Sequence, residues 1–214
     1  MAILTNKEIL ARIKSGDIGF SPNLDKFQLH AHSIDLRLGF TFLIPKSWQV
    51  TERGREALAI DVFDPNMPPY FDVLELEQGQ YFDILPGEYV SVSTLESIKV
   101  PNDLMAVLYP RSSTNRRGLS VDLSGIIDAG YEGQLTIPLR NNTRNQTIRM
   151  YPGERVCQIV FEQLQGAVEP RKSRYHKRDV IEGILVGTLP QEREVEIELI
   201  TAGKIRELKH EHGI

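Results

Sequence analysis

The chain has 214 residues, with 29 Asp or Glu against 25 Lys or Arg and a formal net charge of −4. This length allows one domain with a sizeable core, and the acidic balance gives no reason to expect nucleic-acid or membrane-surface binding. The single cysteine excludes an intramolecular disulfide and suits a reducing compartment. The N-terminus does not resemble a signal peptide, and no apolar run approaches the ~20 residues of a membrane span. We therefore expect a cytoplasmic protein with one domain over residues 1–214.

The first predicted element is a short helix. Thr5 and Glu8 have the spacing of a capping box, Ile9 and Ile13 fall on one face, and Gly16 is a suitable stop.

From residue 33 onward the pattern changes to short strands separated by turns. Strands are predicted at 33–38, 40–44, 81–85, 89–92, 105–109, 119–123, 134–139 and 156–161. Residues 45–69 are mostly polar and are predicted to form an irregular, exposed insertion. Many short strands with turn signals between them predict an all-β barrel or sandwich.

The last part of the chain, from about residue 180, is predicted to be an extension. Glu194 to Ile200 alternates acidic and apolar residues, which favours an edge strand. Residues 201–214 read as a charged terminal helix or a frayed tail.

Two neighbouring segments carry the chemistry. Arg111, Ser112, Ser113 and Arg116 offer guanidinium forks and hydroxyl donors, which match the oxygens of a polyphosphate. A solvated basic loop is the alternative interpretation.

In the second segment, Asp128 lies near Tyr131 between glycines. A carboxylate beside an aromatic ring could bind a sugar and activate a water molecule. The alternative is that Asp128 only caps a turn, because Asp before Ala-Gly favours turns.

Five blocks of sequence resemble the dCTP deaminase and dUTPase superfamily, in family order over residues 4–165. They are Leu4–Ile9 with Gly16–Ile18 and Ser33–Gly39, then Leu85–Pro101, the Arg-Ser-Ser motif at 111–113, the Ile-Asp-Ala-Gly-Tyr motif at 127–131, and Tyr151–Gln158. The resemblance implies a distorted, dUTPase-like β-barrel that assembles as a homotrimer with active sites between subunits. Its expected substrate is a deoxynucleoside triphosphate.

The resemblance also implies roles for individual residues. Ser112 and Ser113 bind phosphate, and Arg116 belongs to a site shared between subunits. Asp128 meets the deoxyribose 3′-hydroxyl and helps to activate the attacking water, while Tyr131 packs against the deoxyribose.

Further implied contacts involve the base and the metal. The backbone of Ser124, Gly125 and Ile126 would read the pyrimidine edge, and Gln158 would contact the nucleotide. Asp35 would lie near a magnesium triphosphate, through water, since Mg²⁺ keeps much of its hydration shell. Alternatively, Asp35 pairs with Arg37 or with another strand.

The basic segment at 171–178 lies where the deaminases keep a mobile lid. Arg174 and Tyr175 resemble the family's Lys-Tyr pair, although a solvated run of charges is an equal alternative. His30 and His32 are interpreted as loop residues, and Cys157 as a buried core residue.

Pro138 departs from the deaminase pattern. The deaminases carry a glutamate ten positions after the residue that matches Asp128, and proline has no proton to exchange. Pro110-Arg111-Ser112 also resembles the Pro-Arg-Ser of dUTPases. The first hypothesis is therefore an Mg²⁺-dependent dUTP diphosphatase. The alternatives are a dCTP deaminase using another base such as Glu132, and a non-catalytic nucleotide sensor.

Overall fold

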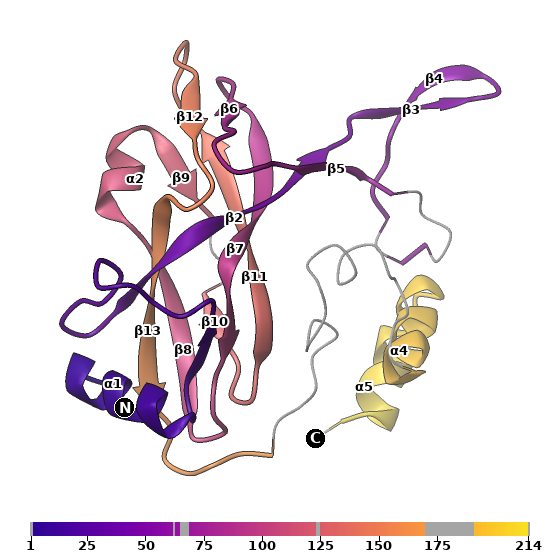
Figure 1. The fold of residues 1–214 in the computed structure, drawn as a ribbon. Coiled ribbons are helices and arrows are strands. Elements are labelled where there is room, and N and C mark those ends of the chain that lie inside the picture. The colour runs from indigo at the N-terminus through magenta and orange to yellow at the C-terminus, as the bar shows by residue number, and fades with distance from the viewer. Residues whose placement is uncertain (1, 62, 65–68, 123–124, 170–190, 214) are drawn as a thin grey trace.

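The computed structural model describes residues 2–61, 63–64, 69–122, 125–169 and 191–213, and its main body is a curled β-sheet (Figure 1). The helices are α1 (Asn6–Ser15), α2 (Ser112–Arg116), α4 (Gln191–Thr201) and α5 (Ile205–Glu211). The strands are β1 (Gly19–Ser21), β2 (Ile34–Pro45), β3 (Trp48–Thr51), β4 (Gly54–Ala57), β5 (Phe71–Glu75), β6 (Phe82–Ile84), β7 (Tyr89–Lys99), β8 (Leu104–Pro110), β9 (Leu119–Val121), β10 (Ile126–Ile127), β11 (Glu132–Asn141), β12 (Ile148–Met150) and β13 (Arg155–Gln163). No helix among these residues is long and apolar enough to cross a membrane.

The main sheet is antiparallel and has the strand order β10-β8-β13-β2-β7-β11-β9. β1 adds to β7, and β5 adds to the outer half of β2. The predicted all-β fold with a short N-terminal helix is confirmed.

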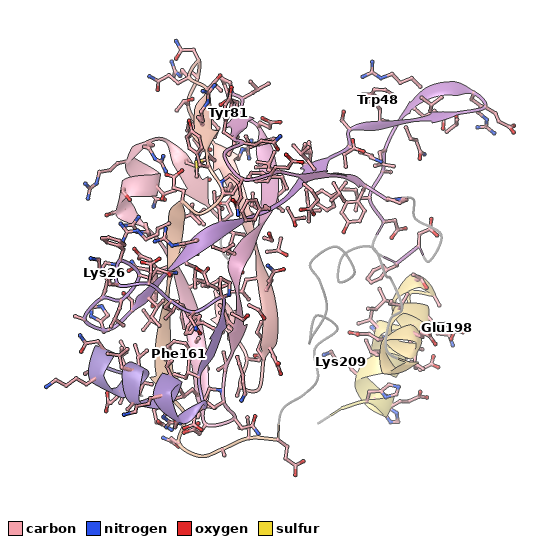
Figure 2. The ribbon with its side chains drawn as sticks, in the orientation of Figure 1. Lys26, Trp48, Tyr81, Phe161, Glu198 and Lys209 are labelled. Carbon is pink, nitrogen blue, oxygen red and sulfur yellow. The ribbon has the colours of Figure 1, made fainter. Side chains whose placement is uncertain are left out.

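The concave side of the sheet holds the core. Fully buried side chains come from every long strand, including Leu36 and Phe42 of β2, Val92 of β7, Ile137 of β11 and Phe161 of β13. Phe161 lies on β13 close to α1 (Figure 2), and its ring meets that of Phe20 edge to face. Burying one such side chain stabilises the fold by about 1.5–3 kcal/mol.

Helix α1 follows its sequence signals closely. The Thr5 amide donates to Glu8 Oε2 over 2.8 Å, which is half of the capping box, and Gly16 ends the helix at φ +81°. The Arg12 guanidinium then pairs with Asp103 over 2.6 Å and ties the helix to the start of β8. The hydrogen bond from Arg12 holds the pKa of Asp103 below its usual value.

β2 is one strand, where the sequence predicted two separated at Gly39. A Cβ at Gly39 would lie 2.3 Å from Ser93 Oγ of β7. The glycine therefore serves the close approach of two strands rather than a turn.

The predicted edge strand at 194–200 is wrong, because these residues lie in α4. Alternation over seven residues also places Val195 and Leu199 four apart, which is one face of a helix. Glu and Leu have high helix propensity, and Leu199 is the buried member of the pair. The terminal helix at 201–214 is confirmed by α5.

Part of segment 45–69 is an ordered hairpin rather than irregular structure. β3 and β4 pair over Trp48–Thr51 and Gly54–Ala57 and stand away from the barrel as an arm (Figure 1). The amide of Lys46 donates to Tyr70 O over 2.8 Å, and that of Leu58 donates to Ser47 O over 3.2 Å. These bonds fasten the base of the arm to the ends of β2 and β5.

Candidate functional site

The Arg-Ser-Ser motif lies where β8 ends and α2 begins. The backbone amide of Arg111 and the hydroxyl of Thr114 both donate to Val156 O, over 3.2 and 3.3 Å, and anchor the turn to β13. Thr114 is buried, while Ser112 and Ser113 are exposed. The Arg116 guanidinium donates to Ser112 Oγ over 3.2 Å. The two predicted phosphate ligands and Arg116 therefore face solvent together.

Asp35 lies at the centre of a group of two arginines and one histidine that we call the Asp35 cluster. Its Oδ2 accepts from Arg111 Nε at 3.0 Å, Arg155 Nη1 at 3.2 Å and His30 Nε2 at 3.0 Å, although Asp35 is only 1% exposed. Arg111 donates further to Arg155 O over 3.1 Å, and Arg155 also donates to Phe27 O.

This arrangement agrees with the alternative prediction that Asp35 pairs with another strand, and a contact with magnesium through water stays a prediction. The carboxylate already balances two guanidinium groups, so it does not fit a direct magnesium ligand. In the part of the chain that the structure describes, no group of three or more His, Cys, Asp or Glu could hold a metal ion. The pairing is with strands β8 and β13 and with a loop, not with Arg37, which pairs with Asp25 at 2.7 Å. Arg111 is therefore held by Asp35 and by the carbonyl of Arg155, and it positions the segment that carries Ser112 and Ser113.

Gln158 lies beside this cluster. It is the register partner of Asp35 on β2 and of Tyr109 on β8, and its Oε1 accepts from Ser33 Oγ over 3.2 Å. The structure thus brings Gln158 and Asp35 together, close to the end of β8 that leads into Arg111.

Asp128 opens a tight turn, residues 128–131, that we call the Asp128 turn. β10 precedes it and pairs with β8, and the Tyr131 amide donates to Asp128 O over 3.2 Å. Gly130 adopts φ +77° and donates to Val100 O over 3.1 Å, while Val100 returns a bond to Tyr131 O over 2.8 Å. The Asp128 side chain is exposed on this framework.

Tyr131 has a fixed orientation. Its hydroxyl donates to Gln134 O over 2.6 Å and its half-buried ring packs against the core. Just before β10, Gly125 takes φ +87° and its carbonyl accepts from the Leu108 amide over 2.8 Å. Ile126 is 63% exposed. Ser124, Arg174 and Tyr175 lie outside the described residues.

The Asp35 cluster and the Asp128 turn lie far apart in one chain. Ile127 is opposite Ala106 of β8. Residues 111–116, which carry Ser112 and Ser113 and which we call the serine loop, follow Pro110, four residues further along the chain. At about 3.3 Å per residue, these points are roughly 13 Å apart.

Between them runs a row of outward-facing side chains that we call the outer face. Its apolar members are Met105, Val107 and Tyr109 of β8 and Ile126 of β10, and its polar members are Gln158 and Glu162 of β13. Tyr109 is 46% exposed and Ile126 63%.

Pro138 lies in the interior of β11, opposite Ser91 of β7. Its carbonyl accepts from the Asp122 amide over 3.0 Å, just past the last pair of the β9 ladder. The N and C=O of one strand residue point to the same side, so the missing N–H falls where β9 has ended. Proline therefore fits without loss of a ladder bond, and the bulge of β11 lies elsewhere, between Gln134 and Thr136.

No carboxylate replaces the glutamate near Pro138 along β11. Thr136 and Arg140 are its neighbours on the same face of the strand. Glu132 is six residues away, or about 20 Å along a strand, and pairs in register with Lys99. Glu132 of the same chain therefore cannot act at the position of residue 138.

Sequence reasoning missed His30 and Arg155 as members of the site. His30 was interpreted as a loop residue, and Arg155 was only part of a motif. Their membership depends on the register of β2 against β13, and the sequence alone does not reveal this register. Cys157, by contrast, is the buried core residue that was predicted, and burial raises the pKa of its thiol.

Comparison with known proteins defines the class. A family model described as dCTP deaminase-like matches residues 3–164. The chain belongs to this family, within the dCTP deaminase and dUTPase superfamily, and the resemblance found in the sequence is confirmed.

Individual relatives have a more specific name. A protein of Methanosphaera stadtmanae named "dCTP deaminase, dUMP-forming" is 33% identical over 208 residues, which are 95% of this chain and 100% of the relative. One of the same name from Sulfurihydrogenibium sp. is 36% identical over 81% of this chain and 91% of its own. The 2′-deoxycytidine 5′-triphosphate deaminase of Agrobacterium tumefaciens has a similar fold, with a TM-score of 0.56 and 24% identity. That match covers 74% of this chain and 48% of the Agrobacterium chain.

Proposed function

We propose that this chain is a dUTP diphosphatase that converts dUTP and water into dUMP and diphosphate. The name of the relatives describes two changes in one substrate: dCTP loses its amino group and its terminal diphosphate to become dUMP. The observation that carries the proposal is that Asp128 is present and exposed on a bonded turn, whereas Pro138 occupies the position of the deaminase glutamate. The residue proposed for the hydrolytic half of the chemistry is then present, whereas the glutamate that serves the deaminating half is not.

In the proposed reaction, the Asp128 carboxylate accepts a proton from a water molecule. The water oxygen forms a bond to the α-phosphorus, and the bond from that phosphorus to the bridging oxygen of the β-phosphate breaks. Ser112, Ser113 and Arg116 hold the phosphate oxygens, and diphosphate leaves with the bond's electron pair. A positioned general base of this kind contributes roughly 10²–10⁴-fold in rate.

We place the substrate between copies of the chain, in a homotrimer. The roughly 13 Å between the Asp128 turn and the serine loop is too long for hydrogen bonds from both to one phosphate group. The apolar outer face between them is suited to contact with another copy. The turn of one copy could then meet the loop of the next.

Magnesium remains a prediction in this scheme. Since Asp35 is occupied by Arg111 and Arg155, Mg²⁺ would enter on the triphosphate, as is usual for nucleotide substrates. The role of Asp35 is to hold Arg111 in place.

A second candidate function is the full reaction named for the relatives, dUMP formation from dCTP. It is favoured by 33–36% identity over most of the chain. It requires a base other than residue 138, and Glu132 of the same chain is too distant. A sensor that binds nucleotide without turnover is the third candidate.

The test is a product assay with dUTP and dCTP supplied separately with Mg²⁺. Chromatography resolves dUMP, dUTP and dCTP, and Asp128→Asn serves as the inactive control. We expect dUMP from dUTP and no change in dCTP. Product from dCTP would establish the second candidate, and tight binding of either nucleotide without product would establish the sensor.

A further inference from the structure

The arm formed by β3 and β4 exposes its apolar residues to solvent, which is unexpected for a hairpin that has no partner. Trp48 and Val50 alternate with Gln49 and Thr51, and it is the apolar pair that is exposed, at 44% and 76%. Their cross-strand partners are Ala57 and Arg55. The polar pair is partly buried. A solvent-facing strand normally shows the opposite pattern.

Nothing within the hairpin compensates for this exposure except one contact. The Arg55 guanidinium lies 4.4 Å from the centre of the Trp48 ring, and such a contact at an exposed site contributes about 0.5–1 kcal/mol. A two-stranded ribbon is only marginally stable in water by itself. The bonds at the base of the arm nevertheless hold it in a defined direction, away from the barrel (Figure 2 labels Trp48 on it). An ordered apolar surface of this kind is suited to a partner.

The outer face of the barrel has complementary chemistry. Met105, Val107, Tyr109 and Ile126 supply apolar surface, and Glu162 is its one charged member. The exposed side of the arm carries Arg55 as its one charged member. An apolar centre on both surfaces, with opposite charges beside it, is the usual composition of a protein–protein contact.

We propose that the apolar side of the arm docks onto the outer face of a second copy of this chain. The contact is heterologous, because it joins different surfaces of the two copies, and such contacts close into rings when the rotation permits. The inference rests on the proposed assembly from several copies and not on the proposed reaction. It gives the arm a function, which is to cover the strands that separate the Asp128 turn from the serine loop.

The first test is cross-linking. Benzoylphenylalanine is placed at position 50 of the full chain, the purified protein is irradiated, and mass spectrometry maps the linked peptides. We expect links between copies, from position 50 to β8 or β10. Links confined to one copy, or links between copies that do not reach β8 or β10, would overturn the proposal.

The second test uses two charge variants of the hairpin. Val50→Glu places a carboxylate on the apolar side, opposite Arg55, and Gln49→Lys places a cation on the other side, opposite Glu56. Both new charges face an opposite charge, so the hairpin itself is preserved. We expect Val50→Glu to raise the subunit dissociation constant about tenfold or more in sedimentation equilibrium, and Gln49→Lys to leave it unchanged.

Equal dissociation constants for the two variants and the parent would contradict the proposal. Circular dichroism melting curves check that both variants are folded. If cross-links form between copies while dUTP is not hydrolysed, the docking surface stands and the proposed reaction fails.

Discussion

The Asp35 cluster and the Asp128 turn are built in opposite ways. In the first, one buried carboxylate contacts two guanidinium groups and the imidazole of His30, which come from segments that are distant in sequence. In the second, backbone hydrogen bonds define the shape, and the Asp128 carboxylate is exposed. The cluster is complete within one chain and should matter most for stability. In the proposed reaction, the turn acts only when the serine-bearing segment of another copy lies next to it.

The largest expected effect lies in the turn. Asp128→Asn should lower the rate of dUMP formation by about 10²–10⁴-fold, because the amide cannot accept the proton of the water. Nucleotide binding, measured by calorimetry, and the unfolding midpoint should change little. Asp122→Asn, at another exposed aspartate near the end of β9, is the control and should keep its activity. Full turnover by Asp128→Asn would disprove the proposed mechanism.

In the Asp35 cluster, the same replacement of Asp by Asn should lower the stability of the fold. Asp35→Asn keeps the shape but leaves Arg111 and Arg155 without their charged partner. Because a hydrogen bond to a charged group contributes roughly 1.5–3 kcal/mol, we expect a loss of about 2–3 kcal/mol in urea unfolding.

The control for this loss is Asp83→Asn, which breaks the exposed pair with Arg149 and should cost less than about 1 kcal/mol. The Mg²⁺ concentration that gives half-maximal turnover should stay unchanged in Asp35→Asn. A shift in that concentration without a loss of stability would make Asp35 a metal ligand after all.

Glu96 extends the buried network and gives it a pH dependence. It is 1% exposed, with Gln28 Nε2 donating to it over 2.6 Å and the Arg37 amide over 3.0 Å. Burial raises the pKa of Glu96, so the folded protein retains a proton that the unfolded chain releases. This contribution to stability is present in full below the unfolded pKa of about 4.3 and is lost as pH rises through the folded value.

The measurement is urea unfolding of the parent and of Glu96→Gln across this range. Gln cannot titrate, so the parent should lose stability relative to the variant as the pH increases. A constant difference between the two proteins would show that Glu96 has the same pKa in both states.

The smallest effect is expected from the hydrogen bond of the Tyr131 hydroxyl, at the end of the Asp128 turn. Tyr131→Phe removes the bond from the hydroxyl to Gln134 O and should cost about 0.5–1.5 kcal/mol of unfolding free energy. Turnover should fall by no more than a few-fold, since the backbone bonds of the turn remain. A loss of activity as large as that of Asp128→Asn would mean that the side chain, not the backbone, defines the turn.

The sequence predicted the elements whose signals are local. The capping box of Thr5 and Glu8 gave the start of α1, and the Arg-Ser-Ser and Ile-Asp-Ala-Gly-Tyr motifs contain the exposed side chains of Ser112, Ser113 and Asp128. The partners of Asp35 were out of reach, because they depend on the register of β13 against β2 and β8. Alternation in a short segment was also insufficient at 194–200, where helix and strand periodicities both fit.

Gly39 and Pro138 show a related difficulty. Gly39 was interpreted as separating two strands, yet it lies inside one long strand, and Pro138 lies inside β11 although proline cannot donate to a strand ladder. Gly39 is required by the nearness of Ser93, and Pro138 is tolerated because β9 stops one residue earlier. Both explanations depend on a neighbouring strand, which the residue itself does not reveal.

The isolation of Cys157 has a practical consequence. It is the chain's only cysteine, it has no exposed surface, and burial raises the pKa of its thiol, so its reactive thiolate form is disfavoured. A cysteine introduced anywhere on the surface would then be the single site that accepts a spin label or fluorophore. Spectroscopic distances between identical labels could map how copies of this chain are arranged without first replacing a native cysteine.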